Sequence, residues 1–192
     1  VFVEAPPHKE AILELHSRGF PYVVANLEIA MDVVATGVDH RRAARDAVSF
    51  LAAMGHERIA LITSPPERLF YGTVIAAYRD ALDALHLPQD PDLLLPVPES
   101  NAFCAYTTLR GFLAEHPAPT ALIAARDWLA QGACQALTET GLVIGRDVSV
   151  VGFDDISWPE SRGFLTTFAE LLYRTGAEAA EMLVERIVSG RR

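Results

Sequence analysis

Short, almost continuously apolar runs alternate along this chain with longer segments of helical periodicity. The first residues, VFVEA, read as a strand, and further strands are predicted at 22–26, 34–38, 58–63, 93–97, 120–125, 148–153 and 165–168. Helices are predicted at 8–18, 40–54, 73–86, 102–115, 128–140 and 173–188. Strands that lack polar alternation are typical of parallel sheets covered by helices on both faces. The pattern therefore predicts an α/β fold with open, doubly wound parallel sheets.

The predicted helices carry their own stop signals. A glycine follows three of them, at Gly19, Gly55 and Gly141. Glycine adopts the left-handed conformation that often ends a helix, so each helix is expected to end there.

Composition argues against several functions. Sixteen Lys and Arg against 25 Asp and Glu give a formal net charge of −9, and such a chain is a poor binder of a phosphate backbone by itself. The one basic run, HRRAAR at 40–45, is expected to lie on the solvent-exposed face of a helix. The two cysteines match no zinc or redox spacing, so we expect reduced, partly buried thiols.

Nothing in the sequence suggests a membrane anchor. No apolar run reaches the roughly 18 residues that a spanning helix needs, and no signal peptide is visible. Because the chain begins at Val1, within an apparent strand and without a methionine, we expect it to be a fragment.

Polar residues follow the carboxyl ends of the predicted strands, where open parallel sheets bind their ligands. These candidates are Asn26, Asp39, residues 64–68, Arg126, Asp127, Asp154 and Asp155. Dispersed histidines and the absence of HExxH or CxxC argue against a metal site. The GxSxG, GxxxxGK[ST] and GxGxxG motifs are also absent. Neither catalytic residues nor a cofactor is predicted, so the chain is not expected to be an enzyme.

Several candidates have a structural interpretation as well. Asp154 either caps a turn or anchors a ligand, and Asp155 is expected to be its structural partner in the turn. Asp127 is predicted to be the N-cap of the helix that follows. Trp128 and Trp158 would stack on a sugar, lie at an interface or simply pack.

Four motifs, taken together, resemble one family. They occur in order as MGHERIALIT (54–63), PTALIAARDWLAQGACQALTETGL (119–142), GRDVSVVGFDDI (145–156) and LTTF (165–168). The set resembles the effector-binding core of the lactose/galactose-repressor family of bacterial transcription regulators, which is related in fold to periplasmic sugar-binding proteins.

The resemblance implies two flavodoxin-like lobes joined by three crossovers. The first lobe, incomplete here, would comprise 1–38 and 170–192, and the second 39–169. A DNA-binding helix-turn-helix would precede Val1, outside this chain. The family also implies a homodimer that reads a two-fold operator.

The resemblance also places ligand contacts in the cleft between the lobes. Carried over position by position, they fall on Asn26, Arg68, Phe70, Val74, Arg126, Phe153, Asp154 and Glu170. Val74 stands where the family usually has an arginine, and Arg126 where it often has asparagine or a small residue. We therefore expect Arg126 to clamp the ligand and to pair with Asp154 or Glu170 in its absence.

The implied function is a cytoplasmic, allosteric effector-sensing domain of a regulator, with a repressor expected. Its ligand would be a small molecule such as a sugar, and its other partner operator DNA, reached through the missing domain. The alternatives are a periplasmic solute-binding protein and an enzyme with this fold, although no motif favours the enzyme.

Overall fold

The computed structural model describes residues 2–3, 9–25, 34–65, 69–156 and 165–190. The chain divides into two compact units, residues 1–39 with 171–192 (unit 1) and residues 40–170 (unit 2). Each unit is an α/β structure built on a parallel sheet.

Unit 2 contains a five-stranded parallel sheet with the strand order β5-β4-β6-β7-β8. Its strands are β4 (Ile59–Thr63), β5 (Leu94–Pro96), β6 (Ala121–Ala124), β7 (Ser149–Asp154) and β8 (Thr166–Ala169). The central strands β4 and β6 are buried along their whole length, which explains their continuous apolar sequences.

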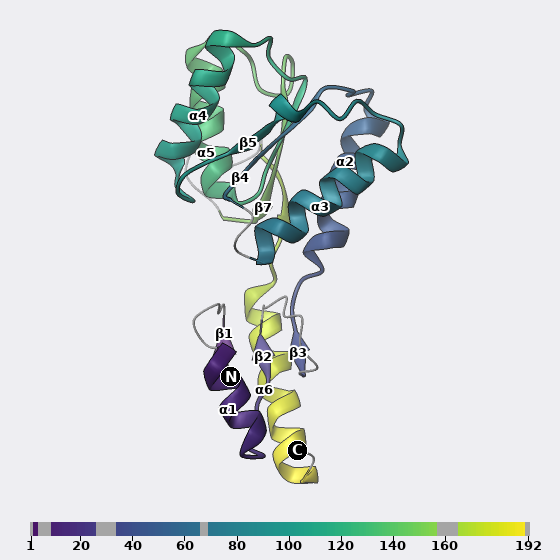
Figure 1. Ribbon diagram of the computed structural model, residues 1–192, viewed down its shortest axis with the longest axis vertical. Coiled ribbons are helices and arrows are strands. Elements are labelled where there is room, and N and C mark those ends of the chain that lie inside the picture. Colours follow the sequence, from purple (N-terminus) through teal and green to yellow (C-terminus); the bar gives the residue numbers. More distant parts are fainter. Residues whose placement is uncertain (1, 4–8, 26–33, 66–68, 157–164, 191–192) are drawn as a thin grey trace. The chain divides into compact units, whose positions relative to one another are not determined.

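Helices cover both faces of this sheet (Figure 1). They are α2 (His40–Ala53), α3 (Leu69–Ala84), α4 (Ala102–Glu115) and α5 (Asp127–Glu139), with a short 3₁₀ helix at Pro91–Leu93. Alternate residues of each strand enter opposite cores. In β4, Leu61 packs with the residues of α2 and α3, whereas Ile62 packs with those of α4 and α5.

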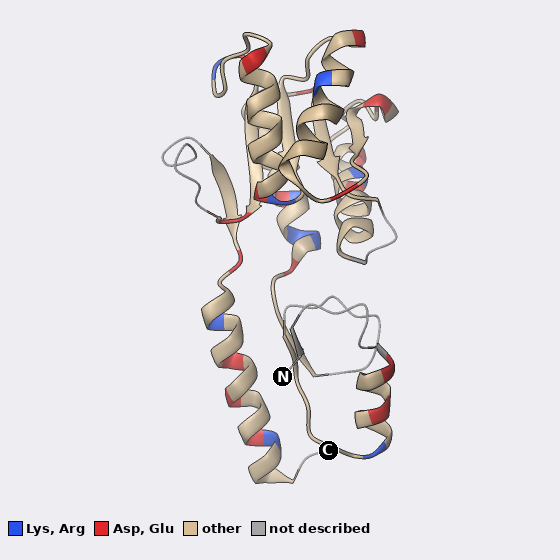
Figure 2. Cartoon of the chain, turned by 90° about the vertical axis from the view of Figure 1, so that its left-hand side faces the viewer, with Lys and Arg blue, Asp and Glu red and all other residues tan. Residues whose placement is uncertain are grey.

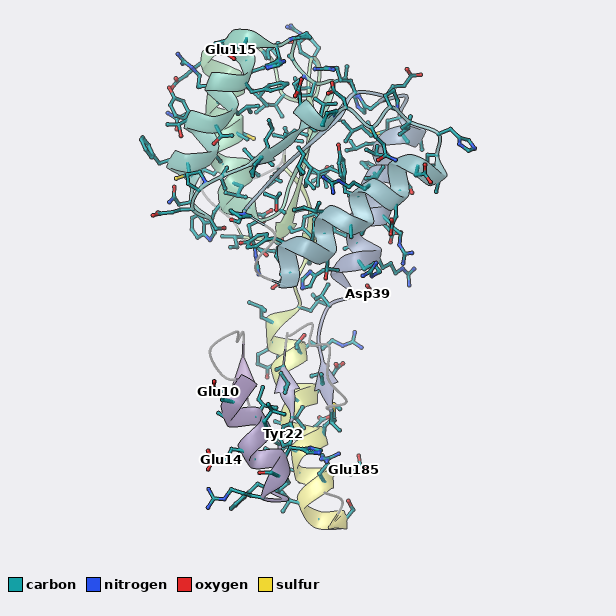
Figure 3. The ribbon with its side chains drawn as sticks, in the orientation of Figure 1. Glu10, Glu14, Tyr22, Asp39, Glu115 and Glu185 are labelled. Atoms are coloured by element: carbon teal, nitrogen blue, oxygen red, sulfur yellow. The ribbon has the colours of Figure 1, made fainter. Side chains whose placement is uncertain are left out.

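Unit 1 contains the three-stranded parallel sheet β1-β2-β3. Its strands are β1 (Phe2–Val3), β2 (Val24–Ala25) and β3 (Ala35–Thr36), and its helices are α1 (Lys9–Ser17) and α6 (Leu172–Ser189). The hydroxyl of buried Tyr22 lies 3.1 Å from His16 Nδ1 of α1. Figure 3 shows Glu10 and Glu14 pointing away from this interior.

Most of the predicted elements are present, with small shifts at their ends. Helix α3 begins at Leu69 rather than at residue 73. Gly19, Gly55 and Gly141 all have positive φ, of 69°, 89° and 85°, which confirms the predicted helix ends.

The basic residues of unit 2 are scattered among acidic ones in the view of Figure 2. The arginines of the 40–45 run, Arg41, Arg42 and Arg45, lie on the exposed face of α2, as predicted. Within the described ranges, no helix combines the length and apolar character needed to cross a bilayer. The same ranges hold no group of three or more His, Cys, Asp or Glu arranged to bind a metal.

Candidate functional site

An arginine and two carboxylates meet at the carboxyl edge of the five-stranded sheet. Arg126 follows β6, Asp154 ends β7 and Glu170 follows β8, and these strands are neighbours. Arg126 Nη1 donates to Asp154 Oδ1 at 2.7 Å and to Glu170 Oε1 at 3.4 Å. The predicted pairing of Arg126 is thus present, with both acidic partners.

Burial and the neighbouring charges shift the pKa values of Asp154 and Arg126. The side chains of Asp154 and Glu170 are only 7% and 5% exposed, and that of Arg126 is 21% exposed. Burial raises the pKa of Asp154 to about 6, and nearby Glu170 adds to that rise while Arg126 opposes it. Burial lowers the pKa of Arg126, but the attraction of both carboxylates outweighs it and the net pKa is raised. The guanidinium therefore stays charged.

Two rings complete the surroundings of Arg126. Its guanidinium carbon lies 4.4 Å from the ring centroid of Phe70, in the first turn of α3. The ring of His40 meets Phe70 edge-on, with centroids 4.7 Å apart. His40 Nε2 lies 3.5 Å from Glu170 Oε1. A ligand at this edge would therefore find an apolar face, a cation and two anions together.

His40 and Glu170 also mark the two ends of unit 2, because the chain enters the unit at His40 and leaves it after Glu170. His40 was not among the predicted site residues. The available signal was its position, two residues after the predicted strand 34–38 and at the start of a predicted helix, near the edge where open parallel sheets place their ligand contacts.

The prediction that Asp127 is an N-cap is wrong. Helix α5 begins at Asp127 itself, and Arg126 occupies the N-cap position without a side-chain cap bond. The fully buried Asp127 carboxylate accepts one hydrogen bond from Ile156 N and another from Thr167 Oγ1, both at 2.8 Å. Burial raises the pKa of Asp127, and these hydrogen bonds oppose the rise.

The structure separates the roles of Asp154 and Asp155. Asp154 points into the cluster, whereas Asp155 is exposed and its backbone N–H donates to Thr167 Oγ1 at 3.4 Å. Both residues have positive φ, 119° and 62°.

Other predicted contacts are not brought into the cluster. Phe153 is almost completely buried in the α2–α3 core and stacks on Phe168 at 5.3 Å. Val74 is fully buried in the same core. Trp128 is about half exposed at the start of α5. Asn26, Arg68 and Trp158 lie outside the described residues.

The raised pKa of Asp154 predicts a pH dependence of stability. Since its pKa moves from 3.8 to about 6 on folding, its contribution to stability is fully present below about pH 4 and is lost as the pH rises through 6. Urea unfolding of the wild type and of Asp154→Asn measures this. We expect the wild type to lose stability relative to the variant between about pH 4 and 6. Parallel profiles would contradict the assigned environment of Asp154.

A parallel sheet covered on both faces, with polar side chains converging at its carboxyl edge, defines a ligand-binding α/β core. Residues 48–192 match the family model described as a periplasmic binding protein-like domain. The chain therefore belongs to that family, in the LacI branch that its motifs resemble.

Known relatives agree with this assignment. The transcriptional repressor PurR of Haemophilus influenzae (strain PittEE) is 32% identical over 147 residues, which are 73% of this chain and 42% of the repressor. A LacI-family regulatory protein from Chloroflexus aggregans superposes with a TM-score of 0.89 and 26% identity, covering 99% of this chain and 68% of that one. A LacI-family regulator from Enterococcus faecium with bound ribose superposes with a TM-score of 0.80 and is 28% identical in sequence. The match covers 96% of this chain and 69% of that one. The chain spans less than half the length of the PurR repressor.

Proposed function

We propose that this chain is the effector-sensing core of a bacterial transcriptional repressor and that its effector is an uncharged, hydroxylated molecule of the sugar class. The observation that carries the proposal is the buried cluster of Arg126, Asp154 and Glu170 at the carboxyl edge of the sheet, in a chain related to repressors and to a ribose-bound regulator. The ligand would replace contacts that these side chains now make with one another.

The charge balance of the cluster favours an uncharged ligand. One guanidinium faces two carboxylates at 2.7 and 3.4 Å, so a phosphate or carboxylate group entering here would be repelled by both acids. A hydroxyl group donates to a carboxylate and accepts from a guanidinium, and neighbouring sugar hydroxyls do both at once. The Phe70 ring supplies the apolar surface that a sugar ring needs.

The location of the cluster suggests how binding would be transmitted. His40 and Glu170, where the chain enters and leaves unit 2, are within 3.5 Å of each other, and Glu170 contacts Arg126. A ligand that draws Arg126 or Glu170 into new contacts would change the interactions at both connections between the units. Binding would then favour one arrangement of the units by its differential affinity for the two.

The remaining parts of the proposal concern the longer protein. It would bind operator DNA through a separate domain, act as a homodimer in the cytoplasm and catalyse no reaction. The relatives that are repressors support this function over that of a periplasmic solute-binding protein.

A thermal-shift panel tests the proposal, because a ligand that binds the folded state raises the melting temperature by mass action. The panel contains ribose, other pentoses, hexoses and disaccharides, each beside its phosphate ester or sugar acid. We expect at least one uncharged sugar to raise the melting temperature of the full-length protein and its charged partner to have a smaller effect. Stabilisation by anionic members alone would contradict the proposal.

A further inference from the structure

Arg126 and Asp127, which are consecutive in the sequence, both form hydrogen bonds with the turn that ends β7. Arg126 Nη1 donates to the Asp154 side chain, and the carboxylate of Asp127 accepts from the backbone N–H of Ile156. The Thr167 hydroxyl donates to the same carboxylate at 2.8 Å and accepts from Asp155 N–H at 3.4 Å. The Asp127 carboxylate therefore joins the start of α5 to the 154–156 turn and to β8.

The Asp127 side chain is closely packed against β7. The residue is fully buried, and a Cβ placed on Gly152 of β7 would lie 2.0 Å from Asp127 Oδ1. Thr167 pairs with Gly152 across the β7–β8 ladder, so the carboxylate occupies the space that the missing side chain of Gly152 provides.

The turn that Asp127 holds is in an unfavourable backbone conformation. Asp154 and Asp155 have φ of 119° and 62°, which costs a non-glycine residue free energy unless surrounding contacts impose it. Asp154 is the turn residue whose carboxylate reaches Arg126 at 2.7 Å. A change of φ at Asp154 would redirect that carboxylate.

We propose that Asp127 is a positioning residue for the ligand site: its buried carboxylate holds the 154–156 turn in the strained conformation that aims Asp154 at Arg126. The consequence for ligand affinity rests on the proposed function, whereas the effect on Asp154 does not. Asp127 itself contacts no ligand in this scheme. It acts through the backbone N–H of Ile156 and the hydroxyl of Thr167.

The test compares four variants of the full-length protein. Asp127→Ala removes both hydrogen bonds, and Asp127→Asn removes the charge while keeping an acceptor for Ile156. Thr167→Val removes one donor but keeps the side-chain shape and the charge of Asp127. Thr166→Val, at the exposed neighbouring position of β8, is the matched control.

The ligand-independent readout is a carbon-13 NMR titration of the Asp154 carboxyl group, with the melting temperature recorded in parallel. We expect Asp127→Ala and Thr167→Val to shift the Asp154 titration from near pH 6 toward that of an exposed aspartate, because a released carboxyl regains solvent. Asp127→Asn is expected to shift it less than Asp127→Ala, although both lack the charge. Thr166→Val is expected to leave it unchanged.

Affinity for ribose, the probe sugar, is the second readout. Thr167→Val is expected to weaken it about tenfold, the typical effect of one lost hydrogen bond. An unchanged Asp154 titration in both Asp127→Ala and Thr167→Val would overturn the positioning role, even where the variants melt earlier. An equal shift in Asp127→Ala and Asp127→Asn with none in Thr167→Val would also overturn it, since charge alone would then explain the effect. Failure of the wild type to bind any sugar would count against the proposed function only.

Discussion

Replacement of Arg126 by methionine is expected to lower the free energy of unfolding by about 3 kcal/mol, because it leaves two buried carboxylates without their cation. Asp154 and Glu170 are less than a tenth exposed, and Arg126 Nη1 contacts both. Methionine keeps much of the aliphatic stem that packs on Phe70 but donates no hydrogen bond. Urea denaturation at neutral pH measures the loss.

A matched single variant and a double variant test whether the loss of stability in Arg126→Met comes from the buried, unpaired carboxylates. Arg146→Met removes an exposed arginine from its pair with Asp147, and such surface pairs contribute little to stability because water screens them. Asp154→Asn combined with Arg126→Met is expected to recover part of the lost stability, since one buried charge is removed with its partner. Equal losses for Arg126→Met and Arg146→Met would contradict the description of the cluster as buried and coupled.

Substitution of alanine for Gly132 is expected to destabilise the protein by about 2 kcal/mol, a typical effect of overpacking. Gly132 lies in α5, where an added Cβ would be 1.9 Å from the carbonyl oxygen of Ala102 in α4. A backbone atom cannot turn aside as a flexible side chain can, so α4 and α5 would have to separate.

Gly111 provides the control for that prediction. It lies within α4, and a Cβ there meets nothing within 4 Å. Gly111→Ala is therefore expected to stabilise the protein by about 0.5–1 kcal/mol through helix propensity alone. Thermal unfolding should move the two melting temperatures in opposite directions. A similar change of the same sign for both would show that the close approach of Gly132 to Ala102 does not limit the packing of these helices.

The fold was largely predictable because unit 2 follows simple sequence rules. Strands such as β6 are apolar on both faces since they lie between two helical layers. Glycines with positive φ end the helices where the sequence places them. The start of α3 was predicted four residues too late, because apolar periodicity locates a helix but does not fix the residue at which it begins.

The candidate site was predictable only in part. The carboxyl-edge rule selects Arg126 and Asp154, and pairing of opposite charges follows from proximity. The role of Asp127 was misjudged because an acidic residue before a helix resembles an N-cap, whereas its partners Ile156 and Thr167 are about 30 and 40 residues away in sequence. Local pattern carries no information on such distant hydrogen bonds.

The central claim is that the Arg126–Asp154–Glu170 cluster binds an uncharged, hydroxylated ligand. The most direct measurement is a calorimetric titration of the full-length protein with the best sugar from the panel and, separately, with its phosphate ester. The account predicts that the uncharged sugar binds at least about tenfold more tightly, because the ester brings an anion against two buried carboxylates. Equal or tighter binding of the phosphate ester would contradict it.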